Sequence, residues 1–310
     1  EITPRAVSTD PVLYYNVYDD IDENKTIGYL FYTGFISNYN NSLYAAFQHF
    51  KEQGVTDLVL DLRYNPGGSI GPTGYLMSRL APKKDVESNS VFTIMGYNTY
   101  VNAAYDANGR ERTSRLGSYN STTEQNPLNA NLDLDKVYII ATGSSASASE
   151  LTTFCLLPFM EVVHIGEETS GKYTASWTVH AYDSYNGKCQ PVYKAESLNS
   201  VAKTKLKNWA MQPIVGRYTD KDGNDFVADG TLIPNHPIES QEYNTETWTP
   251  IGDPNDYLFA KAISLITGNP YDETRFRSAA AIGVESGLKS QQEERISRAV
   301  LLDNLRPIEK

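Results

Sequence analysis

The sequence of 310 residues contains no apolar run that approaches 18 residues, so it predicts no membrane-spanning helix. It also contains no block of Lys and Arg, and its formal net charge is −11. Nucleic acid and anionic membrane surfaces are therefore not expected as partners. No secretory signal segment is visible, and the abrupt start at Glu1 predicts a mature or trimmed chain.

Cysteine is scarce, with only Cys155 and Cys189 in the chain. The two residues either form one disulfide or are separate buried thiols, because sequence alone does not supply the Cα separation that a disulfide requires. Two cysteines together with 22 tyrosines are typical of an exported bacterial protein. A periplasmic or secreted location is the expectation.

Strands that alternate with helices make up most of the chain. Hydrophobic residues make up 40% and charged residues 21%, which suits a packed core. The alternation predicts an α/β domain, and no shift of composition forces a second one. We expect strands at 26–35, 58–62 and 136–141, a strand pair within 90–104, and helices at 42–53, 73–80 and 253–268, the last with Asp253 as its N-cap.

The segment "ATGSSASASELTTF", residues 141–154, holds four serines, Ser144, Ser145, Ser147 and Ser149. Ser/Gly stretches are often linkers. This one follows the buried strand "KVYIIATG" directly and leads straight into an apolar helix, which a linker does not do. Enzymes of the α/β class place their chemistry at such a carboxyl end of a strand. The cluster therefore predicts a serine nucleophile.

A serine nucleophile needs a base. None of the four histidines, His49, His164, His180 and His236, lies beside a glycine-rich turn, and the G-x-S-x-G pattern is not matched. Lysine can replace histidine where burial lowers its pKa. Lys172, in "GEETSGKYTAS", is a candidate base, and the alternative is a surface lysine in a turn.

A third segment, "DLRYNPGG", ends a strand with two glycines. Its freed N–H groups could form an oxyanion hole or a phosphate loop, although the phosphate-loop spacing is not matched. We expect Asp61 and Arg63 to be structural partners around this turn. The segment "DKDGNDF" lacks the acidic residue of a calcium loop at the twelfth position, where Thr231 stands, and predicts a turn. No cofactor or metal is expected.

In this order, the three segments resemble those of the C-terminal processing peptidases, also called tail-specific proteases. "LVLDLRYNPGG" is similar to the family's strand and glycine turn, "SSASASE" to its nucleophile segment and "GEETSGK" to its lysine segment. The resemblance spans about residues 26–268. It implies a crotonase/Clp protease-like α/β core of ββα units, with a mixed sheet flanked by helices.

The resemblance also implies roles for individual residues. Ser147, the middle serine, would be the nucleophile, and Lys172, 25 residues later, would be the base. The N–H of Ala148 and that of Gly67 or Gly68 would hold the oxyanion. Many family members have a glutamine four residues after the lysine to orient it. Here Ser176 stands at that position, with a shorter reach.

The family's usual PDZ domain does not fit into the roughly 25 residues that precede the first core strand. Either this is a trimmed core, which we expect, or substrate tails bind in another way. We therefore expect a peptidase core over residues 1–270 and a peripheral helical segment over 271–310. The expected function is a serine endopeptidase acting on exported, unfolded or tail-tagged polypeptides. The alternative is a non-catalytic protein on the same scaffold that binds a small apolar ligand or a peptide.

Overall fold

The computed structural model describes residues 9–180, 182–185, 188–191, 199–207, 209–225, 230–239, 248–272 and 301–302. Its largest element is a sheet with the strand order β1-β2-β3-β6-β7-β12. β1 pairs antiparallel with β2, and the other strands run parallel to one another. The strands of this large sheet are β1 (Val12–Asp22), β2 (Lys25–Tyr32), β3 (Asp57–Asp61), β6 (Lys136–Ala141), β7 (Glu161–Gly166) and β12 (His236–Pro237).

Both faces of the large sheet are buried, which explains why its central strands are continuous apolar runs. In β3, Leu58 and Leu60 face one hydrophobic core while Val59 faces a second. In β6, Ile139 belongs to the first core and Ile140 to the second. The alternation of side chains along a strand thus divides one apolar run between two cores.

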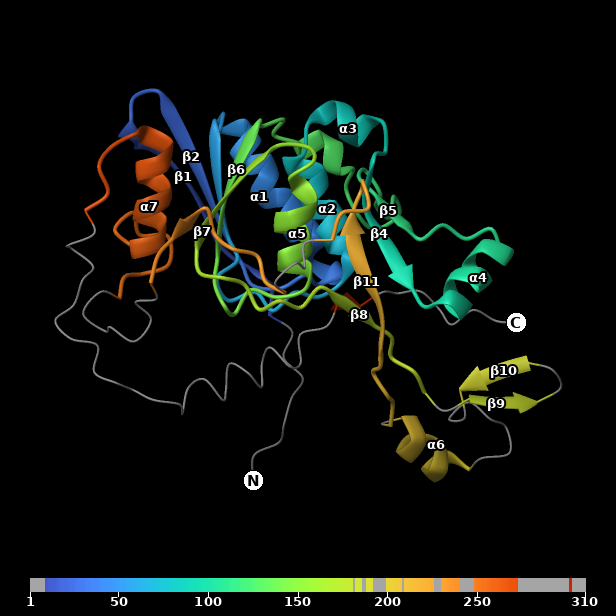
Figure 1. The fold of residues 1–310 in the computed structure, drawn as a ribbon. Coiled ribbons are helices and arrows are strands. Elements are labelled where there is room, and N and C mark those ends of the chain that lie inside the picture. The colour runs from blue at the N-terminus through green and yellow to red at the C-terminus, as the bar shows by residue number, and fades with distance from the viewer. Residues whose placement is uncertain are drawn as a thin grey trace.

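A smaller sheet has the order β13-β8-β11-β4-β5. Helices α1, α2 and α5 lie between it and the large sheet, whereas α7 covers the opposite face of the large sheet (Figure 1). The strands of the small sheet are β4 (Val91–Tyr97), β5 (Thr113–Arg115), β8 (Thr174–Ser176), β11 (Ile214–Asp220) and β13 (Leu301–Leu302), and β9 (Tyr182–Tyr185) pairs with β10 (Lys188–Pro191). The helices are α1 (Asn40–Glu52), α2 (Ile70–Leu80), α3 (Lys83–Glu87), α4 (Thr99–Ala107), α5 (Ala148–Leu156), α6 (Ser200–Lys207) and α7 (Tyr257–Thr267), with 3-10 turns at Ser37–Tyr39 and Pro127–Ala130.

Two expected elements are corrected by the structure. The strand pair within 90–104 is wrong in its second half, because β4 is followed by α4. The side chain of Asn98 accepts a hydrogen bond from Val101 N and caps that helix. The N-cap of α7 is Asp256 and not Asp253. Asp256 accepts from Leu258 N and Phe259 N, whereas Asp253 belongs to the preceding turn.

The C-terminal segment falls mostly outside the described residues. Leu301–Leu302 form a strand, β13, that runs parallel to β8. Cys155 is buried and is a free thiol among the described residues. The side chain of Cys189 lies outside the described residues, and the choice between a disulfide and two separate thiols stays a prediction. Within the part of the chain that the structure describes, no helix has the length and apolar character to span a bilayer.

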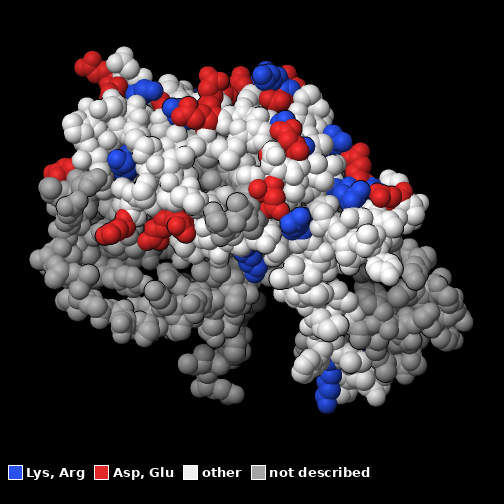
Figure 2. Space-filling model, in the orientation of Figure 1, with Lys and Arg blue, Asp and Glu red and all other residues white. Residues whose placement is uncertain are grey.

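On the face drawn in Figure 2, acidic and basic side chains of the described residues lie interspersed. The acidic excess of the sequence is therefore not gathered into one area of this face.

Candidate active site

The nucleophile segment connects β6 to α5 by a sharp turn. Ser147 is the residue before the helix and has φ 57° and ψ −110°. A positive φ is unusual for a residue other than glycine and is commonly found where function requires it. The G-x-S-x-G pattern is absent, yet the turn places a serine at a strand-to-helix junction in a strained backbone, as that pattern does.

The serines of the cluster have different roles. Ser145 Oγ donates to Leu62 O at 2.7 Å, and Ser149 Oγ donates to Asn65 O at 2.8 Å. Both hydroxyls thereby fix the segment to the loop after β3. Ser147 Oγ is buried, and its hydroxyl proton has no acceptor among the described residues, although the capping box of α5 turns the Glu150 N–H toward this oxygen. A buried hydroxyl that donates no hydrogen bond is costly and suits a nucleophile whose proton passes to a base during the reaction.

The glycine turn packs directly against this serine. Gly67 has φ 100°, and a Cβ on it would lie 2.7 Å from Ser147 Cβ and 2.8 Å from Ala148 N. Gly68 has φ 145°, and a Cβ there would overlap the carbonyl oxygen of Phe35. Both positions therefore require glycine. The turn and the nucleophile segment form one closely packed unit.

The two glycines differ as oxyanion donors. Gly67 N–H already donates to Asn65 Oδ1 at 2.9 Å. Gly68 N–H makes no hydrogen bond within the described residues. Ala148 N–H is the first amide of α5, for which the helix itself supplies no acceptor. The arrangement favours Ala148 with Gly68 over Ala148 with Gly67.

Glu150 joins the nucleophile segment to the lysine segment. Its carboxylate is fully buried. One oxygen, Oε2, accepts from Ser147 N at 2.7 Å and from Lys172 N at 2.9 Å. The other, Oε1, accepts from Gly171 N at 2.7 Å and from Thr169 Oγ1 at 2.6 Å. The backbones of Ser147 and Lys172 are thus held by the same oxygen atom.

Burial has opposite effects on the two ionisable groups of this site. It raises the pKa of Glu150, and the four hydrogen bonds offset only part of the rise. It lowers the pKa of Lys172, which is partly restored by the nearby Glu150 carboxylate. A lowered lysine pKa increases the fraction of neutral amine near neutral pH, which is the form that can accept a proton.

The side chains of Ser147 and Lys172, the expected catalytic pair, are less closely connected than their backbones. Among the described residues, no hydrogen bond joins Lys172 Nζ to Ser147 Oγ, a contact that is often long in an enzyme without substrate. Ser176 lies buried in β8, and its hydroxyl likewise has no partner in the described part of the chain. Its proposed role in orienting Lys172 stays a prediction. No histidine hydrogen-bonds Ser147, and burial lowers the pKa of His164 to about 4.

Sequence reasoning missed Glu150, Asn65 and Tyr218. Glu150 stands three residues after Ser147, the spacing of a capping box, so a signal was present. Asn65 stands two residues before Gly67, within the glycine turn. Tyr218 OH donates to Ser147 O at 3.0 Å from β11. Nothing in the local sequence indicates that contact.

Comparison with known proteins identifies the family. The model of peptidase family S41 matches residues 26–235. The chain belongs to peptidase family S41. This S41 chain is 25% identical over 267 residues to the carboxyl-terminal-processing protease of Synechocystis sp., which covers 86% of this chain and 49% of that protein. The predicted family resemblance is confirmed.

Two further relatives extend the comparison. The nisin-resistance protein of Lactococcus lactis is 23% identical over 177 residues, covering 57% of this chain and 50% of that protein. The S41 chain therefore spans about half the length of the curated relatives it matches. A crystal structure of a candidate S41 protease from Bacteroides fragilis has a TM-score of 0.64 at 24% identity, covering 86% of this chain and 60% of that one. This likeness confirms the predicted α/β fold with a mixed sheet flanked by helices.

Proposed function

We propose that this S41 peptidase is a serine endopeptidase that uses Ser147 as nucleophile and Lys172 as general base. The observation that carries the proposal is the state of Ser147 Oγ. It is buried, lies on a strained turn, and donates no hydrogen bond among the described residues. Beside it lies a lysine segment that Glu150 ties to the same turn.

The reaction follows from these positions. Neutral Lys172 takes the proton of Ser147 as Oγ bonds to the scissile carbonyl carbon. Ala148 N–H and Gly68 N–H stabilise the resulting oxyanion, and losing one such donor typically raises the barrier by about 2.7–4 kcal/mol. When the C–N bond breaks, Lys172 returns the proton to the leaving amine. Water, deprotonated by Lys172, then releases the acyl group and restores Ser147.

The substrate main chain would lie beside β8. This strand starts two residues after Lys172, and its inner edge is paired with β11. Within the described residues, its outer edge is paired only with Leu301–Leu302 of β13. The edge next to Lys172 is thus partly occupied by an extended segment of the chain itself, and a peptide bound there through main-chain hydrogen bonds would take the place of Leu301–Leu302. Such binding reads little of the side chains, which fits unfolded or tail-tagged polypeptides.

The proposed substrates are exported proteins, and the proposed location is the periplasm or the cell exterior. The support is compositional, namely the acidic balance, the many tyrosines and the scarcity of cysteine. Fractionation of the source cells followed by immunodetection tests the location. Detection only in the cytosolic fraction contradicts it.

The deciding experiment compares the wild-type chain with Ser147→Ala on an unfolded protein such as casein, with products identified by mass spectrometry. We expect new internal peptide ends with the wild type and none with the variant. Circular dichroism of both chains checks that the fold is retained. Equal cleavage by the two chains rules out Ser147 as nucleophile. Cleavage by neither favours the alternative, a binding protein on a peptidase scaffold.

A further inference from the structure

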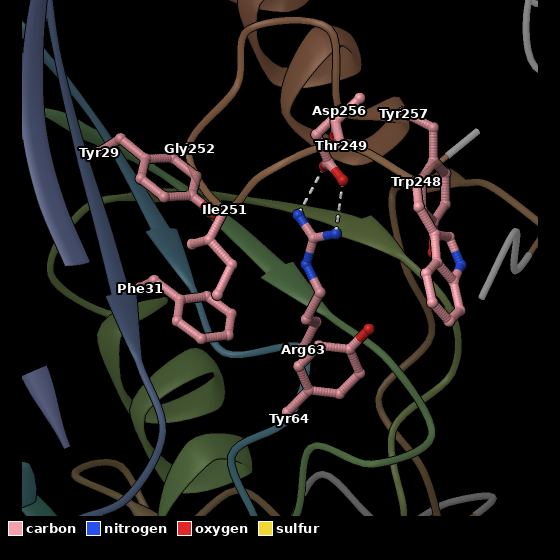
Figure 3. Close-up of a pocket in the computed structure, with 10 residues that line it drawn as sticks. All are labelled: Tyr29, Phe31, Arg63, Tyr64, Trp248, Thr249, Ile251, Gly252, Asp256 and Tyr257. Atoms are coloured by element: carbon pink, nitrogen blue, oxygen red, sulfur yellow. Dashed lines mark hydrogen bonds and ion pairs between the residues drawn. The ribbon is translucent and has the colours of Figure 1, made fainter. Parts of the chain in front are cut away.

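A pocket of about 300 Å³ opens next to the glycine turn on the opposite face of the large sheet from α5 (Figure 3). Its floor is formed by the buried side chains of Tyr29 and Phe31, from β2, and of Arg63. Its walls come from Tyr64, from the loop at 248–252 and from the start of α7. The pocket lies at the carboxyl ends of parallel strands, the usual place for ligands in α/β folds.

Three of the side chains in the walls are large, apolar and exposed, unlike those of a packed core. Tyr64 is 46% exposed, Trp248 67% and Ile251 48%. Figure 3 shows these three side chains on different sides of Arg63, whose guanidinium is turned toward Asp256. Arg63 itself is buried. Three large exposed apolar side chains around one opening mark a binding site more often than chance exposure does.

The polar groups of the floor are already paired with one another. Arg63 uses Nη1 and Nη2 on Asp256, at 2.9 and 2.6 Å, and Nε on Asp61, at 2.9 Å. Tyr29 OH donates to Asp61 at 2.6 Å. One cation thus faces two carboxylates. An anionic ligand would find no free positive charge here, and no other cationic side chain lines the pocket among the described residues.

The pocket is rigidly attached to the proposed catalytic turn. The loop that carries Arg63 and Tyr64 is fixed by Thr142 Oγ1, which donates to Arg63 O at 2.6 Å. It is also fixed by Ala146 N, which donates to Asn65 O at 3.1 Å. Gly68 stands four positions after Tyr64, so their Cα atoms lie within about 14 Å of each other. An extended peptide covers that distance in about four residues.

We propose that this pocket is a subsite that takes one large uncharged side chain of the polypeptide substrate, aromatic or branched aliphatic. The guest residue lies within about four residues of the scissile bond. This inference rests on the proposed peptidase function. Binding at β8 would recognise only the main chain of the substrate. The subsite would give the enzyme a preference for one type of side chain as well.

The test uses quenched fluorogenic peptides that are identical except at one position. That position is moved from four residues before the cut to four after it, and holds Phe, Leu, Ala, Glu or Lys. At one position we expect Phe and Leu to raise kcat/KM about tenfold over Ala, mainly through KM. Glu at that position should give no gain.

Trp248→Ala should abolish this preference, and Trp209→Ala should leave it intact. Trp209 is a matched control, because it is also an exposed tryptophan, 77% accessible, but does not line the pocket. Tyr64→Ala provides a second pocket variant if Trp248→Ala folds poorly. A preference that survives both pocket variants, or one for Glu or Lys, overturns the inference.

A binding measurement separates this inference from the proposed function. Saturation-transfer NMR follows N-acetyl-phenylalaninamide on the Ser147→Ala chain, which cannot cleave by the proposed route. We expect binding that Trp248→Ala removes and Trp209→Ala retains. If the probe binds in this way but wild type cleaves no peptide, the peptidase proposal fails and the ligand class of the pocket stands. Cleavage without side-chain preference or probe binding leaves the peptidase and overturns the subsite.

Discussion

Glu150 and Asp61 are both fully buried carboxylates, but they are stabilised by different partners. Asp61 pairs with Arg63, a cation on the same loop, and with the hydroxyl of Tyr29. Glu150 accepts only backbone N–H groups and one hydroxyl. The ion pair between Asp61 and Arg63 holds the loop after β3 in one conformation. The amides at Glu150 fix two backbone segments, and its carboxylate acts on the Lys172 side chain through charge alone, with no hydrogen bond between the two side chains among the described residues.

Because their partners differ, substitutions of the two carboxylates should have different effects: one mainly on stability and the other mainly on activity. Substitution of Asp61 should weaken the fold, because the buried Arg63 would lose one of its partners. Damage on the Glu150 side should mainly disturb the reacting groups that it positions. The four variants below test this separation, from the largest expected effect to the smallest.

Lys172→Ala should reduce kcat/KM for peptide cleavage by about a thousandfold or more. The loss should occur at every pH, because the proposed mechanism assigns no other base to accept the proton of Ser147. Its stability near neutral pH should rise slightly. The pKa of Lys172 is lowered in the fold, so the wild type carries a cost of desolvating the ammonium at pH values below the unfolded pKa. Urea unfolding at neutral pH measures that gain. Substantial cleavage by this variant contradicts the assignment of the base.

Asp61→Ala should lower the free energy of unfolding by about 3–5 kcal/mol, because it leaves Arg63 buried beside only one carboxylate. Cleavage by the molecules that remain folded should persist. The control is Glu111→Ala, which breaks the exposed Glu111–Arg115 pair and should not measurably change stability. Equal losses in the two variants would remove the distinction between the buried and exposed pairs.

Glu150→Gln should reduce kcat/KM about tenfold, because an amide NH₂ would face N–H donors where a carboxylate oxygen now accepts. The pH profile gives a sharper readout. Activity should rise as pH passes upward through the pKa of Lys172, which is below its usual value. Because the Glu150 charge raises that pKa, its removal should move the rising limb to lower pH. A shift to higher pH contradicts the electrostatic link.

Ser176→Ala should slow cleavage only about two- to tenfold, the effect of one hydrogen bond to the lysine. The measurement is kcat/KM beside the wild type under identical conditions. An unchanged rate shows that Ser176 does not orient Lys172. The glutamine of related enzymes would then have no counterpart at this position.

The sequence predicted those features that depend on local pattern. The central strands were visible as apolar runs, and α7 was visible from its apolar face and from Gly268, which ends it with φ 75°. The family resemblance of the three quoted segments also implied that Ser147 and Lys172 would share a site. Glu150 now ties their backbones together.

Other features were missed because they depend on which hydrogen bond a single side chain makes, or on contacts between distant residues. The segment at 99–107 has enough aromatic and β-branched residues to suggest a strand, and the cap by Asn98 overrides that tendency. The choice of Gly68 over Gly67 as oxyanion donor depends on the side chain of Asn65. The pocket combines residues from β2, the loop after β3 and the chain beyond 247, and no local motif indicates it.

The hydrogen bond from Tyr218 OH to Ser147 O has a consequence for synthesis of the chain. Tyr218 lies in β11, far beyond the nucleophile in the sequence, and buries its ring in the same core as Ala148. The nucleophile turn cannot reach its final packing before the ribosome has passed residue 218. A nascent chain that already carries both Ser147 and Lys172 therefore still lacks part of the support for the proposed site, so self-digestion by the proposed mechanism is disfavoured during translation.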